Sequence, residues 1–100
     1  LIEIRLDGLS DAGIKPDKGT LLATKDAAGD CPILFTNRSK EEGGYFNGLE
    51  EERIIWLEQS VTSGASMIDV ELNTTPALRD RLLQLCKRQG VKTIVSYHNL

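Results

Sequence analysis

The sequence has little cysteine and no long apolar run. Its two cysteines, Cys31 and Cys86, lie far apart and form no Cys-x-x-Cys or Cys/His cluster, so no pattern predicts a zinc site or a disulfide framework. We expect free thiols in a reducing compartment, either the cytoplasm or an organelle stroma. No stretch approaches the roughly 18 apolar residues of a membrane span, and no signal-peptide pattern opens the chain. We therefore expect no membrane partner.

Basic charge is scarce as well. Twelve lysines and arginines face 15 aspartates and glutamates, which gives a formal net charge of −3. Such a chain offers no basic surface to nucleic acid, so we expect no nucleic-acid partner. The residues are 40% hydrophobic and 27% charged, a composition typical of globular proteins. One hundred residues make one modest domain at most.

What the sequence does contain is an alternation of short apolar runs and longer helical patterns. Strands are predicted over residues 1–7, 32–37, 66–72 and 91–98. Helices are predicted over residues 49–63 and 76–89, the first followed by Gly64, the second with Thr75 as N-cap, Pro76 as first residue and Gly90 as stop. Residues 9–29 are less clearly patterned and predict only a short helix near residues 20–27.

Strands that alternate with helices at a spacing near 30 residues predict βαβ units and a parallel sheet. Four such units are half of a (β/α)8 TIM barrel, which needs about 250 residues. A half-barrel alone would leave two open edges and an uncovered interior. We therefore expect an α/β fold in which residues 1–100 are a segment of a single TIM-barrel domain, incomplete at both ends.

Each predicted strand has an apolar face and a face that becomes polar toward the carboxyl end, because side chains alternate along a strand. The polar positions are Glu3, Arg5 and Asp7, then Arg38, then Asp69 and Glu71, and finally Ser96 and His98. The opposite positions, such as Val95 and Tyr97, are expected to pack under helices. In a barrel the carboxyl ends of the strands carry the active site. The pattern predicts a site for a small, polar, anionic substrate.

Single residues allow more than one interpretation. The acids and Arg5 could form an ion-pair network that fills the barrel, whereas Arg38 suits bidentate recognition of a substrate. His98 is the only histidine, and acids facing it would give it the surroundings of a base. Gly43 and Gly44 are interpreted as a flexible loop, and Trp56 as a core residue.

Four pieces of sequence, in this order, resemble the type I 3-dehydroquinate dehydratases. They are Glu3-Ile-Arg5-Leu-Asp7, the run FTNRSKEEGG over residues 35–44, Asp69-Val-Glu71 and Ser96-Tyr-His98. The T-x-R-S…E-G-G run and the S-x-H strand end are fairly specific together, whereas E-x-R-x-D or D-x-E alone is weak. The resemblance covers nearly the whole chain except residues 9–29.

The resemblance implies dehydration of 3-dehydroquinate to 3-dehydroshikimate, without metal or cofactor. A lysine of the family forms an imine with the substrate ketone, and a histidine moves the protons. The matching positions are His98 and its partner Glu42 for catalysis, Glu3, Arg5 and Arg38 for substrate binding, and Asp69 and Glu71 in support. The resemblance also implies a cytoplasmic protein, plastidic in a plant, and leaves a homodimer open as its assembly.

Two positions depart from the family pattern. Asn99 stands beside the base, where the family often has aspartate. The imine lysine is expected on a later strand, beyond Leu100, because Lys92 lies at the start of a strand, which in a barrel is the end opposite the active site. We therefore expect residues 1–100 alone to be inactive.

Two other functions stay open at this point. One is a non-catalytic half-barrel module that binds a small anion, or a partner through its open edge. The other is a different imine-forming barrel enzyme of the aldolase kind, which would not account for the T-x-R-S…E-G-G run. Further βα units with a lysine at a strand end would favour an enzyme over a binding module.

Overall fold

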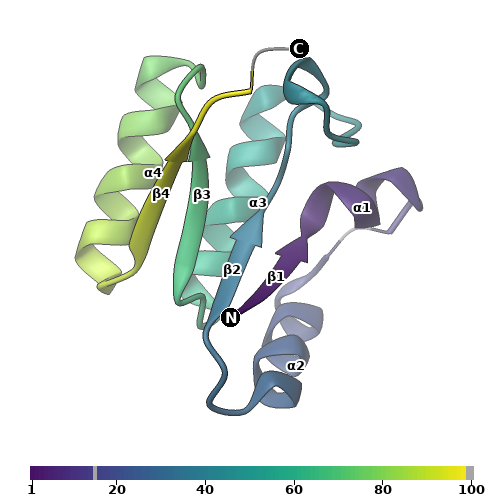
Figure 1. The fold of residues 1–100 in the computed structure, drawn as a ribbon, viewed down its shortest axis with the longest axis vertical. Coiled ribbons are helices and arrows are strands. Elements are labelled where there is room, and N and C mark those ends of the chain that lie inside the picture. The colour runs from purple at the N-terminus through teal and green to yellow at the C-terminus, as the bar shows by residue number, and fades with distance from the viewer. Residues whose placement is uncertain (15, 99–100) are drawn as a thin grey trace.

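The computed structural model describes residues 1–14 and 16–98, so the expectation about Asn99 lies outside the described residues. Strands and helices alternate along this part of the chain (Figure 1). The elements are β1 (Ile2–Arg5), α1 (Leu6–Asp11), α2 (Lys18–Ala28), β2 (Ile33–Thr36), the 3-10 helix η1 (Lys40–Glu42), α3 (Glu50–Thr62), β3 (Met67–Glu71), α4 (Pro76–Gln89) and β4 (Lys92–Ser96).

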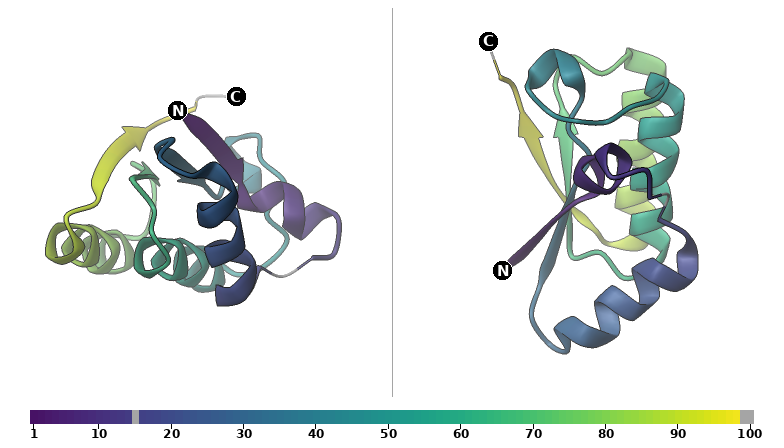
Figure 2. Two further views of the ribbon diagram at one scale, coloured as in Figure 1. Left: turned by 90° about the horizontal axis from the view of Figure 1, so that it is seen from below. Right: turned by 90° about the vertical axis from the view of Figure 1, so that its right-hand side faces the viewer.

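The four strands form one sheet in the order β1-β2-β3-β4, and every neighbouring pair is parallel. The predicted α/β fold with parallel strands is therefore confirmed. Helices α2, α3 and α4 lie on one face of the sheet, while the opposite face is bare in the described part of the chain (Figure 2). The carboxyl ends of all four strands meet at one edge, next to η1 (Figure 1).

The hydrophobic core lies between the sheet and its helices. Ile33 and Phe35 of β2 and Ile68 of β3 are completely buried, as are Ile54 and Leu57 of α3. These are the apolar positions that strand alternation and helical periodicity predict, so both interpretations hold. Burial also raises the pKa of the Cys86 thiol in α4, and both cysteines are free.

The bare face changes character along the strands. Near the amino ends of the two central strands, Leu34 and its register partner Met67 are half-buried, while Glu3 on β1 and Lys92 on β4 flank them in register and are exposed. Toward the carboxyl ends the same face carries Asp69, Glu71 and Ser96. On the two central strands, apolar residues near the amino ends and acidic residues near the carboxyl ends fit the interior of a barrel, whose active site lies at the carboxyl ends.

Two expectations about strand faces were wrong. The first strand ends at Arg5, and Asp7 lies in the first turn of α1, where it is completely buried. The chain turns there because Leu6 enters the core while Asp7 accepts hydrogen bonds from two directions. At the other edge, Val95 and Tyr97 are 57% exposed, because no helix among the described residues covers that side of β4.

The helices keep close to their predicted bounds. Gly64 and Gly90 follow α3 and α4 with φ of 101° and 69°, a backbone conformation that favours glycine. Thr75 precedes α4 as predicted, but its side chain binds Glu50 instead of capping the helix. Helix α2 is longer than expected, since Asp17 caps it by accepting a 2.7 Å hydrogen bond from the Thr20 amide.

The β2–α3 connection is tightly packed at Gly44. A Cβ atom added there would lie 2.3 Å from the Arg38 carbonyl oxygen and 2.4 Å from the Arg38 Cβ. The Gly44 amide also donates a 2.8 Å hydrogen bond to the Ser39 carbonyl. The sequence interpretation as a merely flexible loop was therefore wrong, because a side chain at residue 44 would push the loop away from Arg38.

Replacing Gly44 with alanine is expected to destabilise the complete protein by about 1–3 kcal/mol, because the new methyl group meets backbone atoms that cannot yield. Urea unfolding of the two proteins measures the difference in the free energy of unfolding. Gly8→Ala is the matched control, since a Cβ at Gly8 would have no neighbour within 4 Å. Equal effects of the two substitutions would contradict the steric argument.

Candidate active site

Arg38 is the centre of a buried network at the carboxyl ends of β2, β3 and β4. Its guanidinium pairs with Asp69, and its Nη1 donates to Glu71 Oε2 at 3.1 Å and to Ser96 Oγ at 2.9 Å. The Ser96 hydroxyl in turn donates to Asp69 Oδ1 at 2.5 Å. The sequence placed Arg38, Asp69 and Glu71 at one edge of the sheet, and the structure joins them directly.

Glu71 connects this network to the loop that follows β2. Its Oε2 accepts the Ser39 amide at 2.9 Å, and its Oε1 accepts the Ser39 hydroxyl at 2.7 Å. Arg53 Nη1 lies 3.6 Å from Oε1 on the other side. Glu71 is almost fully buried, so these donors replace the water that a carboxylate would otherwise bind. The start of η1 is thereby fixed to the end of β3.

Glu42 and His98 form a second group. One oxygen of Glu42, Oε1, accepts the backbone amide of His98 at 3.0 Å and lies 3.2 Å from its Nδ1. Glu42 is buried, whereas the His98 side chain is 45% exposed. The family resemblance is what pairs Glu42 with a histidine, because no periodicity of the sequence places Glu42 near His98. The structure supports that pairing.

Arg5 and Asp7 form a third group beside β1. Arg5 Nε and Nη2 donate to the two carboxylate oxygens of Asp7 at 3.0 and 2.8 Å, and these hydrogen bonds raise the pKa of Arg5. Burial alone would raise the pKa of Asp7. The hydrogen bonds from Arg5 and from the amides of Arg38 and Tyr45 outweigh burial, so the pKa of Asp7 is lowered. Asp7 thus ties Arg5 to the loop after Gly44.

Glu3 is placed differently from the other acids. Its Oε2 accepts a 2.7 Å hydrogen bond from the Thr36 hydroxyl on the neighbouring strand. Glu3 is exposed on the bare face of the sheet and forms no ion pair within the described residues. Asp7 pairs with Arg5 and Asp69 pairs with Arg38, so the acids that the sequence grouped with Arg5 do not form one ion-pair network.

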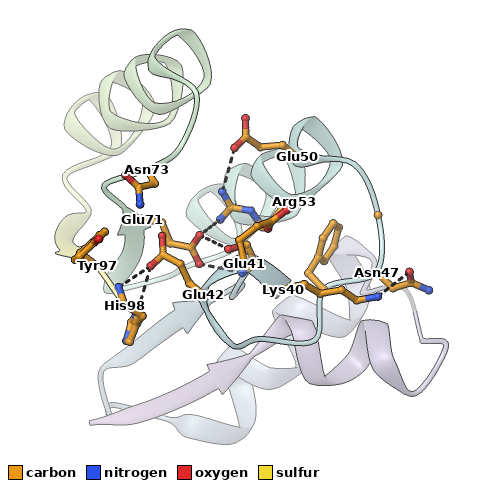
Figure 3. Close-up of a pocket in the computed structure, with 13 residues that line it drawn as sticks. Lys40, Glu41, Glu42, Asn47, Glu50, Arg53, Glu71, Asn73, Tyr97 and His98 are labelled. Carbon is orange, nitrogen blue, oxygen red and sulfur yellow. Dashed lines mark hydrogen bonds and ion pairs between the residues drawn. The ribbon is translucent and has the colours of Figure 1, made fainter. Parts of the chain in front are cut away.

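A cavity of about 660 Å³ opens at the carboxyl ends of β3 and β4 (Figure 3). Glu42, Glu71 and His98 are among the residues that line it, and the carboxylate of Glu42 points toward His98. The other predicted site residues do not line this cavity. Glu3 and Arg5 lie on β1, while Arg38 and Asp69 are held in the buried network beneath it.

Two polar contacts were not anticipated from the sequence. Ser39 is one residue of the run over residues 35–44, and Arg53 belongs to no motif in the sequence. Arg53 precedes Leu57 by four residues and therefore lies on the buried face of α3. A charged residue at a core position of a helical pattern is the signal that could have found it, because such a charge needs a buried partner.

Other expectations concern groups away from these contacts. Lys92 is the first residue of β4, so it lies at the opposite end of that strand from Ser96 and His98. No set of three His, Cys, Asp or Glu side chains is arranged to hold a metal ion within residues 1–14 and 16–98. Among the same residues, no helix has the length and apolar character needed to cross a membrane.

Comparison with known proteins gives one consistent result. The model of the type I 3-dehydroquinase family matches residues 1–100. The chain belongs to this family. A 3-dehydroquinate dehydratase of Geobacillus thermodenitrificans is 41% identical over 104 residues, and one of Methanosarcina barkeri is 36% identical over 101. The structure of 3-dehydroquinate dehydratase from Enterococcus faecalis superposes with a TM-score of 0.82 at 28% identity.

Each of these similarities covers nearly all of this type I 3-dehydroquinase chain but less than half of the other protein. Both sequence relatives match 99% of the chain. The match covers 39% of the Geobacillus thermodenitrificans protein and 41% of the Methanosarcina barkeri protein. The Enterococcus faecalis structure matches 100% of the chain and 42% of its own chain. The chain thus spans about two fifths of the length of these relatives.

Because the pKa of Asp7 is lowered in the folded protein, the protein should lose stability as pH falls. The Arg5–Asp7 pair adds to the free energy of unfolding. This stabilisation is fully present above the pKa of Asp7 in the unfolded chain, near 3.8, and is lost as pH falls through the lower pKa of Asp7 in the folded protein. We expect Asp7→Asn to destabilise the complete protein by roughly 1–3 kcal/mol at pH 7, because charged hydrogen bonds in a buried place are lost. We also expect the variant to be less sensitive to pH below about 4.

Chemical denaturation at a series of pH values measures this difference. Asp11→Asn is the control, because Asp11 is an exposed acid in the same helix. If Asp7→Asn and the wild-type protein lost stability in parallel down to low pH, the titration of Asp7 would not be the cause.

Proposed function

We propose that the complete protein is a lyase that dehydrates 3-dehydroquinate to 3-dehydroshikimate in the shikimate pathway. Membership of the type I 3-dehydroquinase family supports this activity. The observation that carries the proposal is the Glu42–His98 pair at the carboxyl edge of a parallel sheet. That edge is where barrel enzymes place their chemistry.

In this proposal His98 is the general base and acid. A carboxylate at 3.2 Å from Nδ1 favours the tautomer that carries a proton on Nδ1, which leaves the lone pair on Nε2. The buried Glu42 oxygen also holds the backbone amide of His98, so the ring is oriented from two points. The half-exposed imidazole can then take a proton from a substrate carbon and later give it to the leaving hydroxyl.

Arg38, Arg5 and Glu3 are proposed to bind the substrate, with Asp69 and Glu71 in support. Arg5 is suited to an anionic or hydroxyl-bearing ligand, because its side chain remains 42% exposed while Asp7 fixes the direction of the guanidinium. Arg38 is more enclosed, so Asp69 and Glu71 would set the direction of its remaining N–H groups.

The electron sink is proposed to be a lysine supplied by the rest of the domain. Its amine condenses with the substrate ketone to form an imine, and water is released. His98 removes the proton from the neighbouring carbon, and the electrons of that C–H bond move into the imine. When these electrons return, the C–O bond breaks, and the hydroxyl takes the proton from His98 and leaves as water. Hydrolysis of the imine releases the product. Lys92 does not fill this role, because it lies at the amino end of β4.

We also propose that residues 1–100 are a segment of a single TIM-barrel domain. Two observations on the structure support this proposal: one face of the sheet is bare, and Val95 on β4 is exposed. The chain also spans only about two fifths of the length of its relatives. We propose the cytoplasm as its location, or the plastid in a plant. Light scattering of the complete protein distinguishes a monomer from a homodimer.

His98→Ala is expected to abolish turnover of the complete protein while still permitting an imine with substrate or product. The reason is a division of labour, since a lysine makes the electron sink and His98 only moves protons. Borohydride reduction followed by intact mass spectrometry should show an adduct of ligand size on the variant.

Tyr97→Phe is the matched control, because Tyr97 lines the same cavity and is the residue beside His98. It should retain turnover. Near-normal turnover of His98→Ala would show that His98 is not the base. Loss of turnover without any trapped adduct would show that His98 acts earlier, in binding or in imine formation.

A further inference from the structure

Arg53 extends from α3 toward the ends of two strands instead of toward solvent. Its side chain is 3% exposed. Nη1 donates to the Asn37 carbonyl oxygen at 3.2 Å, and Nη2 donates to the Thr74 hydroxyl at 3.2 Å. The Asn37 side-chain amide returns a 3.1 Å hydrogen bond to the Arg53 carbonyl. Arg53 therefore holds the residue that immediately precedes Arg38.

Arg53 also completes a charge balance. Nη1 lies 3.6 Å from Glu71 Oε1, and Nη2 lies 3.9 Å from Glu50 Oε2. Dashed lines in Figure 3 mark both ion pairs. Two buried guanidinium groups, those of Arg38 and Arg53, therefore face the two buried carboxylates of Asp69 and Glu71. Without Arg53, one of these carboxylates would lack a compensating charge, which is costly in a buried place.

The contacts of Arg53 and Glu71 act on the same short segment. Arg53 fixes the carbonyl of Asn37, while Glu71 fixes the amide and hydroxyl of Ser39. Arg38 lies between these two anchored residues, with its guanidinium bound to Glu71. The backbone and the side chain of Arg38 are thus both determined by the pair that Arg53 and Glu71 form.

We propose that Arg53 is a positioning residue for substrate binding, acting through Glu71 and Asn37 on the proposed substrate-binding residue Arg38. This inference rests on the proposed function, because it assigns Arg53 a part in the same site. Arg53 does not touch the reacting atoms. Its role is to keep residues 37–39 and the Arg38 guanidinium in one arrangement before substrate binds.

Three variants of the complete protein test the proposal. Arg53→Met removes the charge and the hydrogen bonds, and Arg53→Lys restores the charge without reaching three acceptors at once. Arg81→Met is the matched control, because Arg81 also pairs with two glutamates, Glu51 and Glu58, but on an exposed surface of α4. Steady-state kinetics with 3-dehydroquinate and thermal melts are measured on each, and amide hydrogen exchange of residues 37–44 without ligand is measured as well.

For Arg53→Met we expect KM to rise about tenfold, the factor for one charged hydrogen bond, while kcat stays within about threefold. Exchange in residues 37–44 should become faster in the same variant. Arg53→Lys should have an intermediate KM, and Arg81→Met should match the wild-type protein in both measurements.

Wild-type KM and unchanged exchange in Arg53→Met would overturn the proposal, as would a fall in kcat with an unchanged KM. If Arg53→Met does not fold, Arg53→Lys decides, and a wild-type KM in that variant would overturn the proposal. A wild-type protein that does not dehydrate 3-dehydroquinate would refute the proposed function instead. The exchange measurement would then still show whether Arg53 orders residues 37–39.

Discussion

The structure depends on the burial of opposite charges at the carboxyl edge of the sheet. The guanidinium of Arg38 is bound by Asp69 and Glu71 from one neighbouring strand and by Ser96 from the next. A buried ion is tolerated only when partners replace its lost hydration, and truncating one partner leaves the others uncompensated. The ends of β2, β3 and β4 are therefore held in one relative position by side chains as well as by the backbone ladder.

This constraint separates the two tasks of the sheet. The face toward α3 and α4 is apolar on β2 and β3 and contributes the hydrophobic core, with Ile33 and Ile68 completely buried. On the two central strands, the bare face is apolar near the amino ends, where Leu34 and Met67 lie. Because residues alternate between the faces, one strand can supply a core residue and a site residue at adjacent positions, as Ile68 and Asp69 do on β3.

Much of this arrangement could be predicted from the sequence, because both faces follow simple periodicities. Strand parity placed Asp69 and Glu71 together, and helical spacing placed Ile54 and Leu57 in the core. The prediction failed where a single contact overrides the pattern. Asp7 continues the alternation of β1 in sequence, yet it enters a helix because Arg5 and the Tyr45 amide bind it. The role of Arg53 depends on partners from β2 and β3 that only the folded chain brings together.

The contact between Gly44 and Arg38 has an evolutionary consequence. Residue 44 follows Glu42 closely in the chain, and it has no room for a side chain because Arg38 lies against it. A change that moves the arginine therefore also displaces the loop that holds the glutamate against His98. Substitutions in the two groups should be epistatic, with combined effects that differ from the sum of the single ones.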